Sequence, residues 1–283
     1  MYVRAALMGL VVAVLGGQTL AADSTQPSAA PPSTEGLAPH RALYTMTLDT
    51  SRTGAKGGGD VRAAQGSMGF EVVDTCDGWA VRQRLRMTIT DSDGQSIEMA
   101  TDYSTWESRD GQTFRFTTKQ MTDAATTSET DGSARFESPG GAGEVHYTAP
   151  GDTTIPLSPG TLFPMSHTAA VIAAAREGKK FVNLPLFDGT DENGPEDSTV
   201  AVLDWKSAAV TPRSTAAGAA LAGLASTRVR LAFFDRQPGT TTPGYEVSMR
   251  YWENGVADDM MMDFGDFVMT VKMTEFSVPP RHC

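Results

Sequence analysis

The sequence predicts a mainly β protein whose strands form one large antiparallel sheet that curls or closes, accompanied by one substantial helix; the open barrel or β-spiral form of the sheet is what a family resemblance, given below, implies. Three observations support this class. Apolar and polar residues alternate along most of the chain after residue 40, Asp-Gly and Asn-Gly pairs punctuate the alternation, and one alanine-rich segment near residues 165–178 interrupts it. The pattern gives about 12–14 strands. A sheet of that size must curl or close, because long flat edges promote aggregation.

Residues 1–22 have the composition of a secretory signal peptide. Arg4 gives the amino end a positive charge, and residues 5–17 then run without a polar side chain. This apolar run is shorter than the roughly twenty residues that span a bilayer as a helix. Small residues favour cleavage after Ala21 or Ala22. No cysteine lies at this cleavage site directly after the apolar run, which excludes lipoprotein-type acylation. We therefore expect the processed chain in the periplasm of a Gram-negative cell, where it does not span the membrane.

The rest of the chain divides into a linker and one domain. Residues 23–39 are rich in Ser, Pro, Ala and Thr, a composition typical of disordered linkers, and residues 40–283 are expected to form a single β-spiral domain. Hydrophobic residues make up 40% of the chain, enough for a sizeable core. The formal net charge of −11 argues against nucleic acid as a partner, because phosphates repel an acidic chain.

The strands are predicted from period-two alternation. Tyr44, Met46 and Leu48 alternate with threonines, and Met68 and Phe70 begin a second alternating run. Each run is typical of a strand that is buried on one face and wet on the other. The later predicted strands are residues 79–89, 97–106, 114–121, 134–137, 144–147, 181–186, 199–203, 227–234, 245–252, 256–262 and 266–278.

Turns are predicted at the Asp-Gly and Asn-Gly pairs, because glycine adopts positive φ without strain. Two stretches that are rich in glycine and other small residues, 54–59 and 206–225, are predicted to be mobile loops. The predicted turns are Asp77-Gly78, Asp93-Gly94, Asp110-Gly111, Asp131-Gly132 and Asn254-Gly255.

The segment near residues 165–178 is predicted to be the substantial helix. Ser166 is a plausible N-cap, the interior is rich in alanine, and Gly178 closes the segment. A mostly small and apolar helix between two halves of a curled sheet is expected to fill the concave side of that sheet.

Cys76 and Cys283 are the two cysteines of the chain. Cysteines pair by default in oxidising compartments, so we predict a disulfide, with free or intermolecular thiols as the alternative. The bridge would close a loop of about two hundred residues and would stabilise the fold by roughly 5 kcal/mol at most, according to the chain-entropy model.

Sequence motifs for catalysis or metal binding are missing. The four histidines have no ligand spacing, and neither Gly-x-Ser-x-Gly nor Ser-x-x-Lys occurs. His167, near the helix start, is more simply a packing or capping residue than a functional one. The acidic stretch 188–197 lacks EF-hand spacing and is read as a solvated loop in preference to a calcium site. We therefore predict a protein that is not an enzyme and has no metal or cofactor.

Methionines suggest an apolar ligand site. Met269 and Met273 share one face of the last predicted strand, and Phe163 and Ile172 lie at the apolar face of the predicted helix. Soft thioethers suit a surface that accommodates variable acyl chains, although methionine also fills gaps in ordinary cores. We take these four residues as the candidate lining of a ligand pocket.

Several local motifs, in order and spacing, resemble the EipB family of alphaproteobacterial cell-envelope integrity proteins. The resemblance implies a periplasmic open spiral around a short helix, a cysteine pair that maps onto Cys76 and Cys283, and no catalytic activity. It also implies a role in maintaining the envelope and a functional link to a periplasmic tetratricopeptide-repeat protein. The motifs are Ala38–Tyr44, Cys76–Trp79, Gly160–Pro164, Phe187–Gly189 and Asp263–Phe267.

Three functions remain open at this stage. The first is a non-catalytic protein that maintains envelope integrity by binding an envelope protein. The second is a carrier or sensor of a lipid or lipoprotein acyl chain, held in the concave face of the sheet. The third, a hydrolase of envelope glycan, would need two carboxylates at a defined separation in a cleft, and the sequence supplies only acidic residues for it.

Overall fold

The structure, a computed structural model, describes residues 32–279 apart from 56–59, 209–210, 213 and 238. Its strands form a single fourteen-stranded antiparallel sheet, as predicted. The sheet order is β8-β7-β6-β5-β4-β3-β2-β1-β14-β13-β12-β11-β10-β9, so the two edge strands, β8 and β9, are not hydrogen-bonded to each other and the sheet stays open.

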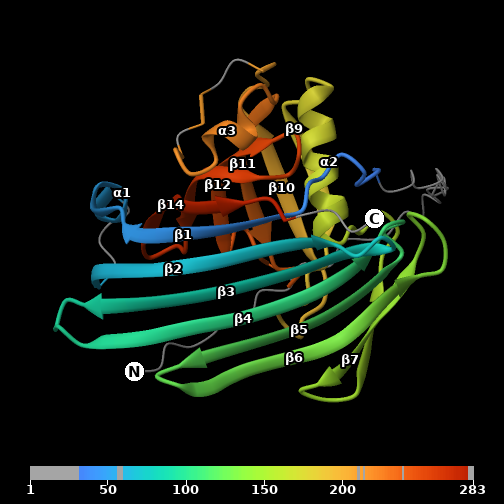
Figure 1. The fold of residues 1–283 in the computed structure, drawn as a ribbon. Helices are drawn as coiled ribbons and strands as arrows, with labels where there is room; N and C mark the ends of the chain where they lie inside the picture. Colours follow the sequence, from blue (N-terminus) through green and yellow to red (C-terminus); the bar gives the residue numbers. More distant parts are fainter. Residues whose placement is uncertain (1–31, 56–59, 209–210, 213, 238, 280–283) are drawn as a thin grey trace, which may run out of the picture.

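The sheet has two arms joined by the pairing of β1 with β14 (Figure 1). The first arm contains β1 His40–Leu48, β2 Val61–Asp74, β3 Gly78–Asp91, β4 Ser96–Ser108, β5 Thr113–Thr122, β6 Ala125–Phe136, β7 Gly143–Ala149 and β8 Thr153–Leu157. The second arm contains β9 Phe181–Leu186, β10 Glu196–Val202, β11 Ser226–Phe234, β12 Tyr245–Trp252, β13 Ala257–Asp263 and β14 Val268–Ser277. The helices are α1 Thr50–Ala55, α2 Pro164–Arg176 and α3 Gly218–Leu221.

The two arms curl so that their apolar faces enclose a common core. Along β1, Ala42, Tyr44 and Met46 are buried while their neighbours are more exposed, which is the alternation that the sequence shows. The segment after β9 reaches across to the first arm, where the Tyr103 hydroxyl donates to the Asp188 carbonyl at 2.9 Å. Thr118 donates to the Gly189 carbonyl at 2.8 Å. These contacts hold the end of one arm against the inner face of the other.

Helix α2 agrees with the predicted helix in position but differs in its cap. The N-cap is Phe163 rather than Ser166, and Pro164 follows it at the first helical position, where its missing N–H leaves no intrahelical bond unmade. His167 is buried within the helix, and its Nε2 lies 2.7 Å from the Ser198 Oγ. Because Ser198 Oγ donates to the Leu184 carbonyl, His167 Nε2 is the donor in this pair. His167 is therefore a buried packing residue of the core in this structure.

The predicted turn at Asp131-Gly132 is wrong, since both residues lie inside β6. Gly132 is needed there because a Cβ would collide with the His146 carbonyl oxygen and would lie 2.9 Å from the Phe116 ring. Strand β8 was not predicted, because its five residues show too short an alternation to recognise.

The folded part begins before His40, which corrects the predicted linker boundary. Thr34 and Leu37 are buried, and the Trp79 indole N–H donates to the Thr34 hydroxyl at 2.9 Å. The Ala38 N–H donates to the Asn254 carbonyl at 2.9 Å. Residues 33–39 are thus held by side-chain and main-chain contacts that composition does not reveal. The predicted signal peptide, residues 1–22, and the linker up to residue 31 lie outside the described residues.

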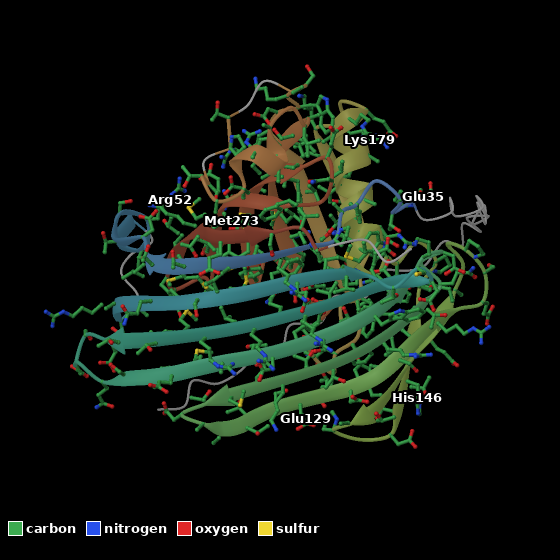
Figure 2. All side chains as sticks on the ribbon, viewed as in Figure 1. Glu35, Arg52, Glu129, His146, Lys179 and Met273 are labelled. Carbon is green, nitrogen blue, oxygen red and sulfur yellow. The ribbon has the colours of Figure 1, made fainter. Side chains whose placement is uncertain are left out.

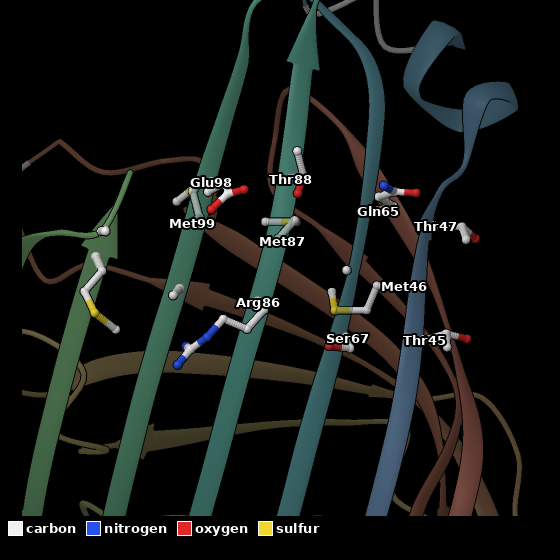
Figure 3. A pocket seen from close by; sticks show the side chains of 14 residues that line it. Thr45, Met46, Thr47, Gln65, Ser67, Arg86, Met87, Thr88, Glu98 and Met99 are labelled. Atoms are coloured by element: carbon white, nitrogen blue, oxygen red, sulfur yellow. The ribbon is translucent and has the colours of Figure 1, made fainter.

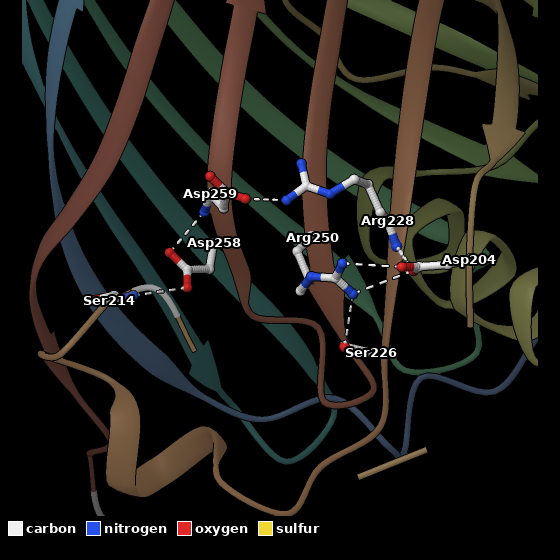
Figure 4. A network of polar contacts seen from close by, with 7 residues as sticks. All are labelled: Asp204, Ser214, Ser226, Arg228, Arg250, Asp258 and Asp259. Atoms are coloured by element: carbon white, nitrogen blue, oxygen red, sulfur yellow. Dashed lines mark hydrogen bonds and ion pairs between the residues drawn. The ribbon is translucent and has the colours of Figure 1, made fainter. Parts of the chain in front are cut away.

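Residues 206–225, predicted to be a mobile loop, instead pack on the sheet in their described part. They contain α3, whose Leu221 is fully buried, and the Ser214 N–H donates to Asp258 at 3.3 Å (Figure 4). Beside this contact, Arg250 pairs with Asp204 at 3.2 Å and Arg228 pairs with Asp259. The segment itself is fastened by the Ser214 contact with β13 and by the main-chain pairing of Lys206 with Ser226 at the start of β11. Within the described residues, none of the helices has both the length and the apolar character needed to cross a membrane.

Candidate functional site

A partly enclosed cavity of about 180 Å³ lies between the two arms and beneath α2. It is bounded by the inner faces of β1 and β2 on one side, β12 and β13 on the other, and the first turns of α2. Apolar side chains dominate the lining, among which methionine occurs five times. These methionines are Met68, Met165, Met249, Met260 and Met262.

Among the residues that the structure describes, no charged side chain lines this cavity. The Tyr44 hydroxyl donates to the Ala257 carbonyl at 2.9 Å, and burial raises the pKa of Tyr44, so the phenol stays neutral. Burial likewise lowers the pKa of His40, whose Nδ1 lies 2.9 Å from the Ala38 carbonyl oxygen. An uncharged and methionine-rich cavity favours an apolar group, because a charged ligand would lose its hydration without finding a partner.

The four residues predicted to line a ligand pocket are core residues, and none of them lines this cavity. Phe163 stacks between Phe114 and Phe136, with ring centroids 4.9 and 4.8 Å away. Ile172 packs in the cluster of Trp79, while Met269 and Met273 are buried in the larger core between the arms. Period-two alternation identifies the inner face of a strand, but it does not tell which inner positions border empty space. A ligand pocket at these four residues stays a prediction, and the cavity described above is a separate candidate.

Cys76 occupies the turn between β2 and β3, with φ of 73°. Its N–H donates to the Asp74 carboxylate at 3.0 Å, which supports this left-handed conformation. Cys283 lies outside the described residues, so its pairing with Cys76 stays a prediction.

Glu107 of β4 is a buried carboxylate that the sequence reasoning missed. Its oxygens accept the Met165 N–H at 2.7 Å, the Ser166 N–H at 2.9 Å and the Ser166 hydroxyl at 2.5 Å. It thus satisfies the free donors at the N-terminus of α2 and faces the positive end of the helix dipole. Burial nonetheless raises the pKa of Glu107 to about 7, because desolvation outweighs these hydrogen bonds. The sequence did contain a signal for this buried carboxylate, namely a glutamate at an inner-facing position of a strand.

The acidic stretch 188–197 is less solvated than predicted. The Asp188 carboxylate accepts both the N–H and the hydroxyl of Thr190, and burial raises its pKa. Burial and the neighbouring carboxylates of Asp188 and Asp191 raise the pKa of Glu196 to about 8. Among the described residues, no three His, Cys, Asp or Glu side chains come together in a way that could hold a metal ion.

A larger hollow, about 730 Å³, is an open groove on the solvent side of β1–β5 (Figure 3). Thr45, Ser67 and Arg86 lie opposite one another across this face and are exposed. Exposed polar side chains cover most of the outer surface of the sheet (Figure 2). The groove is therefore ordinary solvated sheet surface, and the smaller, partly enclosed cavity is the better candidate for a binding site.

Comparisons with known proteins agree with this architecture. A family model described as EipB-like matches residues 31–280. The cell envelope integrity protein EipB of Brucella abortus (strain 2308) is 31% identical over 246 residues, which cover 86% of this chain and 84% of that protein. A crystal structure of a β-barrel-like protein from Brucella abortus, described as a domain of unknown function, superimposes with a TM-score of 0.74 at 27% identity. The superposition covers 86% of this chain and 99% of the Brucella chain.

Proposed function

This chain belongs to the EipB-like family, and from that premise we propose that it maintains the integrity of the cell envelope as a non-catalytic binding protein of the periplasm. The Brucella relative is a cell envelope integrity protein, which supports the envelope role. The observation that carries the binding role is the uncharged cavity beneath α2. In this proposal the cavity receives an apolar side chain of an envelope protein, and the family resemblance points to a tetratricopeptide-repeat protein as that partner.

The size of the cavity favours a side chain over a whole lipid. A volume of about 180 Å³ equals that of about six water molecules, whereas sites for drug-sized ligands measure about 300–1,000 Å³. One leucine, methionine or aromatic side chain fits that space. Buried apolar anchors of this size, each seated in a pocket, contribute most of the binding energy in protein interfaces.

A substitution that fills the cavity tests the proposal. Ala257 lines the cavity from β13, and Ala257→Phe would place a ring in the space that the ligand needs. Ala257→Ser is the matched control, because it changes the same position and leaves the volume open. We expect Ala257→Phe to fold with an unchanged or higher melting temperature but to fail to restore detergent resistance in a deletion strain, whereas Ala257→Ser restores it. Full restoration by a folded Ala257→Phe protein would contradict the cavity as the functional site.

The second candidate is a carrier or sensor of a lipid or lipoprotein acyl chain, and the methionine-rich lining favours it. The cavity as it stands has room only for the end of such a chain, so a carrier would require α2 to move away from the sheet. Native mass spectrometry of the protein purified from periplasm, followed by lipid extraction, separates the two candidates. Recovered lipid that Ala257→Phe abolishes would support the carrier, and its absence together with failed binding of fluorescent fatty acids would remove it.

A further inference from the structure

We propose that the free edge of β9 is a docking site for an extended, acidic and apolar segment of a partner protein, which adds to the sheet as a further strand. This inference rests on the proposed function in one respect, that the chain acts through a protein partner. It assigns the contact to a surface separate from the cavity.

The main-chain groups of β9 define the site. On the side of β9 that faces away from β10, the Leu162 N–H donates to the Pro185 carbonyl and the Phe187 N–H donates to the Leu162 carbonyl, both at 2.9 Å. Because N–H and C=O groups alternate sides along a strand, those of Asn183 and Phe181 also point to this side. No hydrogen bond within the described residues reaches them. The outer edge of β9 is thus paired with Leu162 at the end near Pro185 and is open at the end near Phe181.

The open end is accessible. Phe181 is 74% exposed, the most exposed large apolar side chain in the described part of the chain, and Asn183 is exposed as well. A groove of about 410 Å³ runs beside this edge between α2 and β9. Figure 1 shows α2 standing next to β9, at the end of the sheet order. Apolar side chains make up much of its lining, with Thr161, Glu177 and Lys179 as the polar members. The apolar side chains nearest the edge come from Leu162 in the loop before α2, Ala170, Ala173 and Ala174 in α2, and Val182 and Leu184 in β9, and Pro32, Gly111, Phe136, Gly140 and Gly160 complete the lining.

These features select an extended polypeptide as the occupant. Unpaired N–H and C=O groups at strand spacing are matched by another main chain, and alternate side chains of an added strand would point into the apolar groove. The exposed cations Arg176, Lys179 and Lys180 lie at the rim (Lys179 is labelled in Figure 2). Arg176 pairs with Glu253 at 3.6 Å and Lys179 pairs with Glu177 at 2.9 Å, so the rim keeps an excess of one positive charge. A partner segment with acidic residues beside its apolar ones complements this charge.

A second copy of the chain fits this edge poorly. Symmetric pairing of two β9 strands would bring two basic rims together, and like charges oppose that arrangement. The open stretch is also short, because Leu162 already occupies the end near Pro185. About four residues of strand extend only about 13 Å, too little edge for the roughly 1,200 Å² that a stable dimer buries.

The test compares two substitutions at one position. Asn183→Pro removes the outward N–H and leaves the side that pairs with β10 intact, whereas Asn183→Ala keeps the N–H and removes only the side chain. The probe is a short synthetic peptide in which alternating valines and threonines are flanked by paired aspartates. The control peptide has the same sequence with methylated backbone nitrogens. Binding to the parent and to Asn183→Ala is followed by NMR of the amide signals at positions 181 and 183, and binding to Asn183→Pro by the Phe181 amide signal.

We expect the probe to shift both amide signals and to bind Asn183→Ala as it binds the parent. Asn183→Pro should weaken binding about tenfold, as expected when a partner's main-chain acceptor loses its donor, and the methylated peptide should not bind. Absence of the amide shifts, binding that survives Asn183→Pro, or a dimer formed through β9 would each overturn the proposal. Melting temperatures of both variants establish that they fold.

Complementation distinguishes this proposal from the function itself. If Asn183→Pro folds and restores detergent resistance while the probe fails to bind, the β9 surface is refuted and the envelope role stands. If the parent chain does not restore resistance, the proposed function fails whatever the probe does.

Discussion

Glu107 gives the sharpest prediction about the fold, because its carboxylate is buried at the N-terminus of α2 and its pKa is raised from 4.5 to about 7. Between these two values the folded state holds a proton that the unfolded state has released. The native state therefore loses stability as the pH rises through this range. The stabilising contribution of protonated Glu107 to the unfolding free energy is fully present below pH 4.5. The size of the effect is about 3 kcal/mol.

Glu107→Gln removes this titration. Glutamine cannot accept all three donors, because its amide NH₂ would face one of them, so the variant is expected to be less stable at acidic pH. At higher pH the parent carries a buried charge and the variant does not. The difference in unfolding free energy between the two proteins therefore narrows or reverses. The difference in unfolding free energy between the two proteins should change by about 3 kcal/mol from about pH 4.5 to pH 8, a relative shift in melting temperature of about 6–12 °C.

Thermal unfolding followed by circular dichroism across this pH range measures the effect. Comparing the two proteins cancels the other buried groups, whose titration is common to both, including Asp188 and Glu196 with raised pKa values and His167 with a pKa lowered to about 4. Ser166→Ala is a further control. It removes a hydrogen bond that lowers the pKa of Glu107, so the transition should move to higher pH. Parallel stability profiles for parent and Glu107→Gln would refute the reasoning.

Two further predictions concern the sheet and the predicted disulfide. Gly132→Ala should lower the unfolding free energy by about 1–3 kcal/mol, because its Cβ would collide with β7, while Gly69→Ala, where nothing lies within 4 Å, should be neutral or slightly stabilising. Chemical denaturation measures both, and equal effects at the two glycines would contradict the register of β6 with β7. Cys76→Ser should reduce thermal stability, by up to about 5 kcal/mol, only if the cysteines pair. A reducing agent should then destabilise the parent and leave the variant unchanged, and a parent that is indifferent to reduction would disprove the bridge.

Local patterns predicted most of the sheet because the inner and outer faces differ in burial along strands such as β1, β5 and β10. The same patterns failed where the deciding contact came from a distant segment. Asp131-Gly132 has the composition of a hairpin turn, but the close approach of β7 makes the glycine necessary within a strand. Thr34 is buried only because Trp79, far away in sequence, donates a hydrogen bond to it. Composition alone could not separate such a segment from a flexible linker.

The candidate site was harder to predict for a related reason. Phe163 and Met269 were chosen as apolar residues on inner faces, and the structure confirms that both are buried. A cavity, however, arises where opposing side chains from two arms leave space, and this depends on how β1 and β2 meet β12 and β13. Registers along each arm follow from neighbouring strands, whereas the distance between arms is set by the curl and by α2. Sequence periodicity contains no measure of that distance.

Both proposed binding surfaces border α2, and this determines how they can be tested. Met165 and Thr168 of α2 contact the cavity, while Ala170, Ala173 and Ala174 line the groove beside β9. A substitution in α2 would alter both surfaces at once, and near its N-terminus it would also disturb the contacts with Glu107. Ala257 lies on β13 and Asn183 on β9, with β12, β11 and β10 between these strands in the sheet order. Loss of envelope function in one variant and not in the other therefore identifies which surface the partner uses, and equal loss in both indicates a partner that needs both contacts.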